Sequence, residues 1–436
     1  MYIILLSLGG FFEYYDLFFT GYVAPGLVKS HILTATTRGF FGSGGIASFV
    51  AAMFAGLFLG TLVLSFAADR FGRRKIFTFS LLWYSTATVV MALQSDASGL
   101  NLWRFLAGIG VGVQLVTIDS YVSELAPKAV RGRAFALNNM IQFCAVPVVA
   151  LLAWLLVPVS PFGLDGWRWV VLIGAVGATL VWRVQRQVPE SPRWLVQHGR
   201  IDDAERVLDA LEARVTRESG APLPLIGPTE PAQSKGTLRE IWRPPYLSRT
   251  IMLIVFNLFQ TVGFYGFSNW VPTLLIARGI KVTTSLEYTF LIAMAAPVGP
   301  LLGAAFADKI ERKWLIVLTA GGIAIFGLLF GQSSTAAPLI TLGVLLTLSA
   351  NTLSFAFHAY QAELYPTRIR ARAVGLVYSW SRLSVVFFAY VISFVLDRFG
   401  VSGVFTLIAG SMGVVMLAIG ILGPRSNNLA LETISE

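Results

Sequence analysis

The chain has 436 residues, of which 56% are hydrophobic and 13% are charged, with a mean hydropathy of +0.71. Soluble globular domains carry about 25% charged residues, so this composition excludes a soluble domain and indicates an integral membrane protein. The net charge of +10 raises the question of nucleic-acid binding, which the placement of the basic residues answers below.

Twelve apolar runs follow one another along the chain. Most are close to the ~20 residues that a helix needs to cross a ~30 Å hydrocarbon core, and they lack the short alternating segments of a β-barrel. The sequence therefore predicts an all-α membrane protein with twelve transmembrane helices, at residues 2–27, 45–68, 76–94, 100–125, 134–158, 167–188, 247–276, 287–307, 314–332, 338–362, 373–397 and 402–423.

The basic residues are distributed unevenly between the two sides of these spans. When residues at the ends of spans are counted with the adjacent loop, 25 of the 33 Lys and Arg belong to the loops after even-numbered spans, the central segment and the tail. Six belong to the other loops, and Arg104 and Arg382 lie inside spans. By the positive-inside rule, both termini and the central segment are predicted to be cytoplasmic. The basic charge is thus a topology signal, and we expect no nucleic-acid partner.

The first span, within "GGFFEYYDLFFTGY", carries two acids, Glu13 and Asp16. Positions i and i+3 share one helix face, so one inward stripe holds both away from lipid. A charge at the bilayer centre costs about 2.5 to 3.5 kcal/mol, and burial favours the protonated form of a carboxyl group. Both acids are candidates for carrying a proton; the alternative is an acid held permanently by a salt bridge or hydrogen bonds.

The fourth span contains Arg104, in "WRFLAGIGVGVQ". Arg104 and Asp16 both belong to the outer half of their spans, so we expect them to pair. Protonation of Asp16 would release Arg104 and lower the barrier to a conformational change. A static ion pair that fixes helix packing is the alternative.

The loops reveal a repeat. "DRFGRRK" begins at Asp69 and "DKIERKW" at Asp308, 239 positions later; "SELAPKAVRGR" and "AELYPTRIRAR" keep the same offset. A six-span unit repeated in the same orientation predicts two bundles that face each other across a central cleft. The offset also makes Asp119 and His358 equivalent, as a possible proton relay or a plain hydrogen-bond network.

Three segments follow from this pattern. Residues 1–188 form the first six-helix bundle and residues 247–436 the second, with a short tail. Between them, residues 189–246 combine apolar positions at helical spacing with a stretch rich in Pro, Gly and Ser, which predicts amphipathic cytoplasmic helices and a linker.

These motifs resemble the major facilitator superfamily. "DRFGRRK" is similar to its signature between helices 2 and 3, and "PESPRWL" to the sugar-porter motif after helix 6. "EYYDLFFTGYVAPGL" resembles helix 1 of the aromatic-acid and metabolite proton symporters, with Asp16 on the second acid of their pair. "SRLSVV" resembles their "GRIGAI" segment, which places Arg382 on their intramembrane arginine.

The resemblance implies roles for further residues. Proton-linked sugar porters set an Asp of helix 1 against an Arg of helix 4, as expected for Asp16 and Arg104. Loop charges in this superfamily pair between the bundles when the protein faces outward, and the matching cytoplasmic gate here is Asp69, Arg73, Arg74, Glu124, Arg131, Arg133, Glu190, Arg193, Asp308, Arg312, Glu363, Arg370 and Arg372. A solvated basic rim is the alternative for each Arg.

Arg382 has no acidic residue within its own predicted helix, so a cation is expected in the cleft. Its planar fork suits a carboxylate, although an acid across the cleft, Asp16 or Glu13, is an alternative partner. Polar and aromatic residues of the spans that are candidates for binding a ligand are Gln142, Asn257, Gln260, Tyr265, Trp380 and Tyr360.

We therefore expect a proton-coupled importer of a small organic anion, such as an aromatic or sugar-derived carboxylate, that works by alternating access. We expect no enzymatic role, because HExxH, GxSxG and phosphate-loop motifs are absent from the sequence. Protons are the expected coupling ion, with no other cofactor and no metal. The expected setting is a bacterial cytoplasmic membrane, with one chain as the complete unit. Symport of a sugar or polyol is the first alternative, and transport of an organic cation or drug the second.

Overall fold

The computed structural model describes residues 2–34, 45–63, 67, 70–125, 131–185, 188–219, 237–306 and 309–426, and within these ranges it contains helices and no strand. The first half is built from α1 (Tyr2–Lys29), α2 (Gly45–Val63), α4 (Arg73–Ala92), α5 (Ala97–Leu125), α6 (Arg131–Phe143), α7 (Ala145–Leu156), the 3-10 turn η2 (Pro161–Gly163) and α8 (Gly166–Gln185). The second half is built from α11 (Tyr246–Ser268), α12 (Val271–Ala277), α13 (Val282–Ala293), α14 (Val298–Phe306), α15 (Arg312–Gln332), α16 (Ala336–Glu363) and α17 (Thr367–Leu422).

The helices account for the twelve predicted spans. In the described ranges, nine helical segments are long and apolar enough to cross a membrane, and the last of them contains two spans. Gly400 separates these two: its φ of 66° and ψ of −167° interrupt α17, in a region that glycine reaches without steric cost. The helices α5 and α8, with 29 and 20 residues, supply two further spans.

Three predicted spans are each divided into two helices, and proline explains every break. Proline has no N–H, and its ring clashes with the carbonyl group four residues earlier. Pro147, Pro272 and Pro297 stand four residues after the last residues of α6, α11 and α13, namely Phe143, Ser268 and Ala293. The sequence expectation of one continuous helix for each of these spans is therefore corrected: each consists of two helices that follow one another.

The predicted repeat is visible in the helix boundaries. α4 begins at Arg73 and α15 at Arg312, while α5 begins at Ala97 and α16 at Ala336. Both pairs differ by the offset of 239 that the loop motifs show. The two halves therefore repeat one unit of structure.

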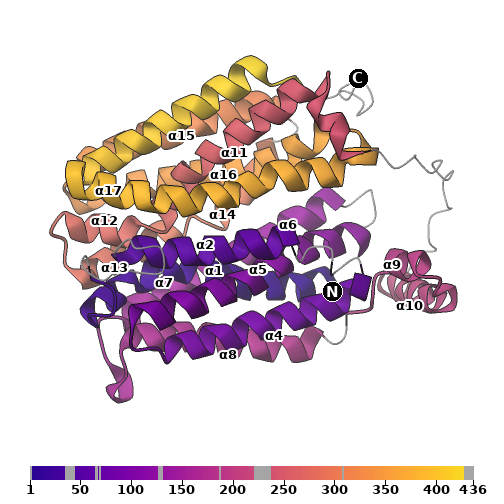
Figure 1. Cartoon of the computed structure of the whole chain (residues 1–436), viewed down its shortest axis with the longest axis horizontal. Coiled ribbons are helices and arrows are strands. Elements are labelled where there is room, and N and C mark those ends of the chain that lie inside the picture. Colours follow the sequence, from indigo (N-terminus) through magenta and orange to yellow (C-terminus); the bar gives the residue numbers. More distant parts are fainter. Residues whose placement is uncertain are drawn as a thin grey trace.

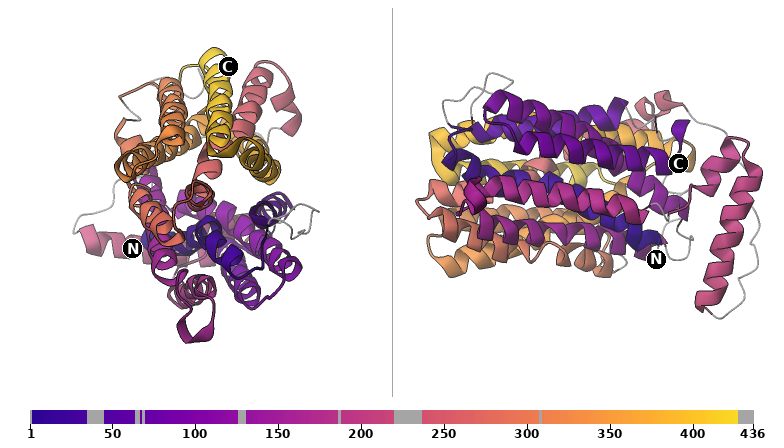
Figure 2. Two further views of the ribbon diagram at one scale, coloured as in Figure 1. Left: turned by 90° about the vertical axis from the view of Figure 1, so that its left-hand side faces the viewer. Right: turned by 90° about the horizontal axis from the view of Figure 1, so that it is seen from below.

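The two halves lie side by side with their helices running in roughly the same direction (Figures 1 and 2). The short helices α9 (Pro192–Gln197) and α10 (Ile201–Ser219) project from one end, and the 3-10 helix η3 (Leu238–Trp242) leads into α11. We call this end, where α1 also begins, the linker end, and the other end the far end. Within the predicted linker, α10 is a helix whose Ala204 is buried against Trp194 and Leu195 of α9.

The halves meet tightly toward the far end. Trp154 of α7 stacks on Phe290 of α13, with ring centroids 5.7 Å apart. Gly21 of α1 lies so close to α12 that a Cβ atom there would sit 2.4 Å from the backbone oxygen of Asn269. Only a residue without a side chain permits this approach, so the far end is closed by backbone and ring contacts.

Candidate functional site

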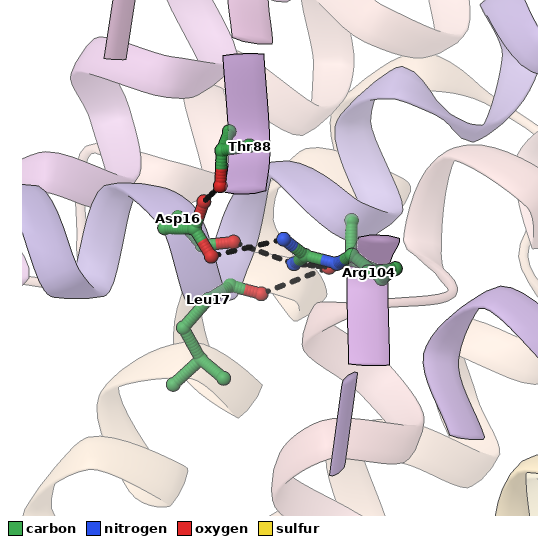
Figure 3. A network of polar contacts seen from close by, with 5 residues as sticks. Asp16, Leu17, Thr88 and Arg104 are labelled. Carbon is green, nitrogen blue, oxygen red and sulfur yellow. Dashed lines mark hydrogen bonds and ion pairs between the residues drawn. The ribbon is translucent and has the colours of Figure 1, made fainter. Parts of the chain in front are cut away.

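The predicted pairing of Asp16 with Arg104 is present inside the first half. Arg104 Nη1 donates to Asp16 Oδ2 at 2.9 Å, and Nη2 donates to the backbone oxygen of Asp16 at 2.6 Å. Thr88 of α4 donates its hydroxyl to Asp16 Oδ1 at 2.9 Å (Figure 3). Both carboxylate oxygens therefore have a donor.

The surroundings of this pair are apolar. Arg104 is fully buried and Asp16 is 3% exposed, while the Arg104 guanidinium lies over the rings of Phe19 and Phe49 at 4.2 and 5.3 Å. Removing one partner of a buried pair leaves an uncompensated charge, which typically costs about 3 to 5 kcal/mol. A proton on Asp16 would instead neutralise the acid and weaken its hold on the arginine.

Glu13 lies one turn before Asp16 and is 1% exposed. The hydroxyl of Tyr84 on α4 is within electrostatic range of both acids. Asp16 and Glu13 therefore face α4 and α5 in the first half. The described residues that line the central cavity include neither acid.

A cavity of about 30 Å³ lies between the two halves. Its first-half wall consists of Tyr14, Leu17 and Phe18 of α1, Leu115 of α5 and Phe143 of α6. Its second-half wall consists of Gln260, Phe264 and Tyr265 of α11, Ser354, Phe357 and His358 of α16, and Tyr378 and Arg382 of α17. A cavity needs about 10 to 15 Å³ of such space to hold one water molecule, so this one has room for only a few waters.

Arg382 lies in the second-half wall of this cavity and is 3% exposed. Nη1 donates to the hydroxyl of Tyr265 at 2.8 Å, and Nη2 donates to that of Tyr378 at 3.0 Å. The guanidinium also lies 4.7 Å from the centroid of the Tyr378 ring. Within the described residues Arg382 Nε has no hydrogen-bond partner. The expected alternative, a pairing of Arg382 with Asp16 or Glu13, is wrong for this structure because both acids face away from the cavity.

His358 continues this network toward the linker end. Its Nδ1 lies 2.6 Å from the backbone oxygen of Ser354, and its Nε2 lies 3.2 Å from the hydroxyl of Tyr378. Its side chain is exposed to solvent, in contrast to Arg382. The suggested relay to Asp119 stays a prediction, because the Asp119 side chain lies outside the described residues.

The remaining ligand-binding candidates divide into two groups. Gln260 and Tyr265 line the cavity, as predicted. Trp380 and Tyr360 do not: Trp380 is 36% exposed, and the buried Tyr360 donates its hydroxyl to Pro424 O at 2.8 Å, near the end of α17. A helix advances by 100° per residue, so positions two away from Tyr378 and His358 point to the other side.

Gln142 and Asn257 are buried but not among the described cavity-lining residues. Gln142 packs against α1, where a Cβ atom on Gly10 would lie 2.3 Å from Gln142 Nε2. Asn257 donates to the backbone oxygen of Leu253 at 2.8 Å within its own helix. Both contribute to packing in this arrangement of the halves.

The predicted gate residues gather at the linker end. Arg312 pairs with Glu363 at 2.7 Å within the second half, and Glu190 accepts from the backbone N–H groups of Arg73 and Arg74 at 2.9 and 3.2 Å. The Nε of Arg370 donates to Tyr365 O at 3.1 Å. Exposed members are Arg74, Arg133, Arg193 and Arg372. Asp69 and Asp308, together with the side chains of Glu124 and Arg131, lie outside the described residues.

The sequence candidates for the site omitted Thr88, which donates to Asp16. Thr88 gave no signal, because a hydroxyl in a transmembrane helix usually bonds to its own backbone.

Comparison with known proteins shows which family this chain belongs to. The family model for sugar (and other) transporters matches residues 2–436. The chain is 32% identical to the putative metabolite transport protein YyaJ of Bacillus subtilis, covering 96% of this chain and 90% of that protein. It is 29% identical to the niacin transporter NiaP of Acinetobacter baylyi, covering 98% and 94%.

Among solved structures, the partially occluded inward-open form of the xylose transporter XylE from E. coli matches with a TM-score of 0.78 at 18% identity, covering 98% of each chain. This likeness shows the fold. Together with the match along residues 2–436, it establishes that the chain belongs to the sugar (and other) transporter family of the major facilitator superfamily, multi-pass membrane transporters rather than enzymes.

Proposed function

We propose that this transporter takes up a small organic anion together with protons by alternating access. The observation that carries the proposal is Arg382: a buried guanidinium in the cavity between the halves, held by two phenolic hydroxyls instead of a carboxylate. A buried cation is costly unless an anion compensates it, and a substrate carboxylate supplies that charge with a geometry that fits the guanidinium fork.

Asp16 and Arg104 provide the proton coupling in this proposal. The pair is sealed in an apolar site, so its charge state can change only when a proton binds or leaves. Protonated Asp16 releases Arg104 and lets the halves rearrange, whereas the ionised pair resists it. Protons are the coupling ion, with no further cofactor.

The proposed orientation in the membrane rests on the distribution of the basic residues. The linker end, where α1 begins and α9 and α10 project, faces the cytoplasm, and the protein resides in a bacterial cytoplasmic membrane. A single chain supplies both halves of the cavity, so a monomer is the working unit.

Aromatic monocarboxylates are the first class to test. The cavity wall offers the rings of Tyr14, Phe18, Phe264 and Tyr378 beside Arg382, an arrangement suited to a flat acid. One relative is described as a niacin transporter, and niacin is such an acid.

Proton-coupled sugar uptake is the second candidate, favoured by Gln260, whose amide could bond a hydroxyl group in the cavity, and by the likeness to a xylose transporter. Transport of an organic cation has less support, because Glu13 and Asp16 face the interior of the first half.

The test uses purified protein in liposomes that contain a pH-sensitive dye. Nicotinate, benzoate, gluconate, acetate and xylose are added in turn outside, and acidification of the lumen is recorded for wild type and Arg382→Gln. Acidification by one class of carboxylate, lost in Arg382→Gln, is the expected result. Acidification by xylose alone, retained in the variant, would replace the anion proposal with sugar symport.

A further inference from the structure

One hydrogen-bonded chain connects an exposed histidine with the buried cation. It runs from Ser354 O through His358 and Tyr378 to Arg382, with contacts of 2.6, 3.2 and 3.0 Å. His358 is exposed and lies five residues before the end of α16, whereas Arg382 is 3% exposed. The proton-coupling pair of the proposed function, Asp16 and Arg104, takes no part in this chain.

The donors and acceptors of the chain can be assigned. A carbonyl oxygen only accepts, so His358 Nδ1 carries a hydrogen that points to Ser354 O. In the neutral imidazole Nε2 is then an acceptor, and the hydroxyl of Tyr378 donates to it. That hydroxyl also accepts from Arg382. In this contact, the hydroxyl proton of Tyr378 points to His358 while the imidazole is neutral.

Among the described residues, the titratable or charged side chains that line the cavity with His358 are Tyr14 of α1, Tyr265 of α11, and Tyr378 and Arg382 of α17. Arg312 of α15 is engaged with Glu363 at the end of α16. Arg382 and His358 share the hydroxyl of Tyr378. An anion bound to Arg382 would compensate the guanidinium and remove its repulsion of a positive charge on His358.

We propose that His358 is a second proton site that is loaded together with the substrate carboxylate, and that Tyr378 is the positioning residue that links the two. When a carboxylate binds Arg382, His358 Nε2 takes a proton from water, and the resulting imidazolium donates a hydrogen bond to the oxygen of Tyr378. The O–H of Tyr378 then turns from the imidazole to the carboxylate. This inference rests on the proposed anion transport and adds a proton to its stoichiometry.

When the carboxylate leaves Arg382, the same steps run in reverse and His358 releases its proton. Departure of the carboxylate frees the Tyr378 O–H to turn back toward Nε2, which must give up its proton to regain a lone pair. Because the side chain is exposed, that proton passes directly to water at the linker end. The anion and the proton therefore leave on the same side.

Calorimetry in buffers of different ionisation enthalpy counts the protons taken up per bound anion. The probes are the five-compound set named above, applied to the purified full chain. Above the pH at which the ligand-free imidazole titrates, wild type is expected to take up about one proton more per bound carboxylate than His358→Gln, and its log Kd to change with pH by about one unit more steeply. Tyr378→Phe should still bind the anion but lose the same proton.

A matched control is available in the same chain. His198 also places Nδ1 near the carbonyl oxygen four residues earlier, 3.0 Å from Trp194 O, but it follows α9 far from the cavity. His198→Gln should leave proton uptake unchanged. Carboxylate binding with the same proton count in wild type and His358→Gln would overturn this inference and leave the proposed function intact. Failure of every carboxylate in the set to bind would reject both.

Discussion

At Asp16, the carboxylate, its backbone oxygen and the hydroxyl of Thr20 are gathered around one arginine. Arg104 donates to all three groups, and Thr88 supplies the remaining donor. Protonation of Asp16 removes the negative charge that compensates the buried Arg104. The hold of Asp16 on Arg104 therefore depends on the protonation state of this carboxyl group.

Asp16→Asn should therefore abolish coupling and retain binding. The amide keeps a hydrogen bond to Arg104 but cannot exchange a proton at neutral pH. We expect substrate-driven acidification of liposomes to fall to the level of empty vesicles, while calorimetry still detects the substrate. Thr88→Val is the control, since losing one hydrogen bond costs only about 1 kcal/mol and leaves the carboxyl group in place. Acidification by Asp16→Asn at the wild-type rate would remove Asp16 from the mechanism.

Arg382 and Trp380 offer a second comparison, two residues apart on one helix. Arg382→Lys keeps the charge but loses the planar fork, so the Kd of the transported carboxylate should rise by about tenfold or more, roughly 1.4 kcal/mol. Trp380→Leu, at an exposed position, should change it by less than about twofold. Equal effects on the Kd, measured by calorimetry, would contradict the placement of Trp380 outside the site.

Whether a site residue could be predicted from the sequence depended on its charge. A charge in an apolar span is expensive, so Asp16, Arg104 and Arg382 were identifiable from the sequence alone. Aromatic residues in spans carry no such cost, and the sequence did not separate Tyr265, which lines the cavity, from Trp380, which does not. The helix face that Glu13 and Asp16 share was predictable, but the direction of that face depends on how α1 is rotated against α4.

At the scale of helices, the contact between the two halves at the far end depends on small residues and on breaks in the helices. Hydropathy predicted the spans, and the repeat offset predicted corresponding helix starts. Proline positions were also visible in the sequence, yet the closure between α1 and α12 was not, because the contact of Gly21 with Asn269 requires the two halves to be assembled.

Gly21→Ala is predicted to prevent that closure. Alanine normally stabilises a helix relative to glycine by about 1 kcal/mol, so loss of function here would come from the new methyl group, which would meet Asn269 O at 2.4 Å. We expect uptake to fall close to background. The opening can be detected with Thr289→Cys in a Cys144→Ser background, because Thr289 lies on α13 at a buried contact between the halves. Gly21→Ala should accelerate alkylation at position 289 by about tenfold.

Gly410→Ala provides the matched control, because a Cβ atom at Gly410 would meet nothing within 4 Å. It should transport normally and leave the cysteine protected. If Gly21→Ala also transports normally, α1 and α12 do not need to approach this closely during the cycle.

At the scale of the whole molecule, the proposed two proton sites and one anion site would together determine the net charge moved. A monovalent carboxylate that enters with protons on both Asp16 and His358 carries about one positive charge inward, and about 2.3 kcal/mol per 100 mV then adds to the driving force. An inside-negative potassium diffusion potential should accelerate uptake by wild type. The same potential should have little effect on His358→Gln if that variant still transports, and equal stimulation of both proteins would argue against a second proton.

The contracted cavity has a practical consequence for anyone who seeks ligands. Sites for small molecules usually enclose about 300 to 1,000 Å³, so the space of about 30 Å³ must expand roughly tenfold before an organic acid can enter. Virtual screening against this shape would discard the true substrates and favour water-sized fragments. Because separating the walls consumes part of the binding free energy, a substitution that props them apart should tighten binding while slowing turnover.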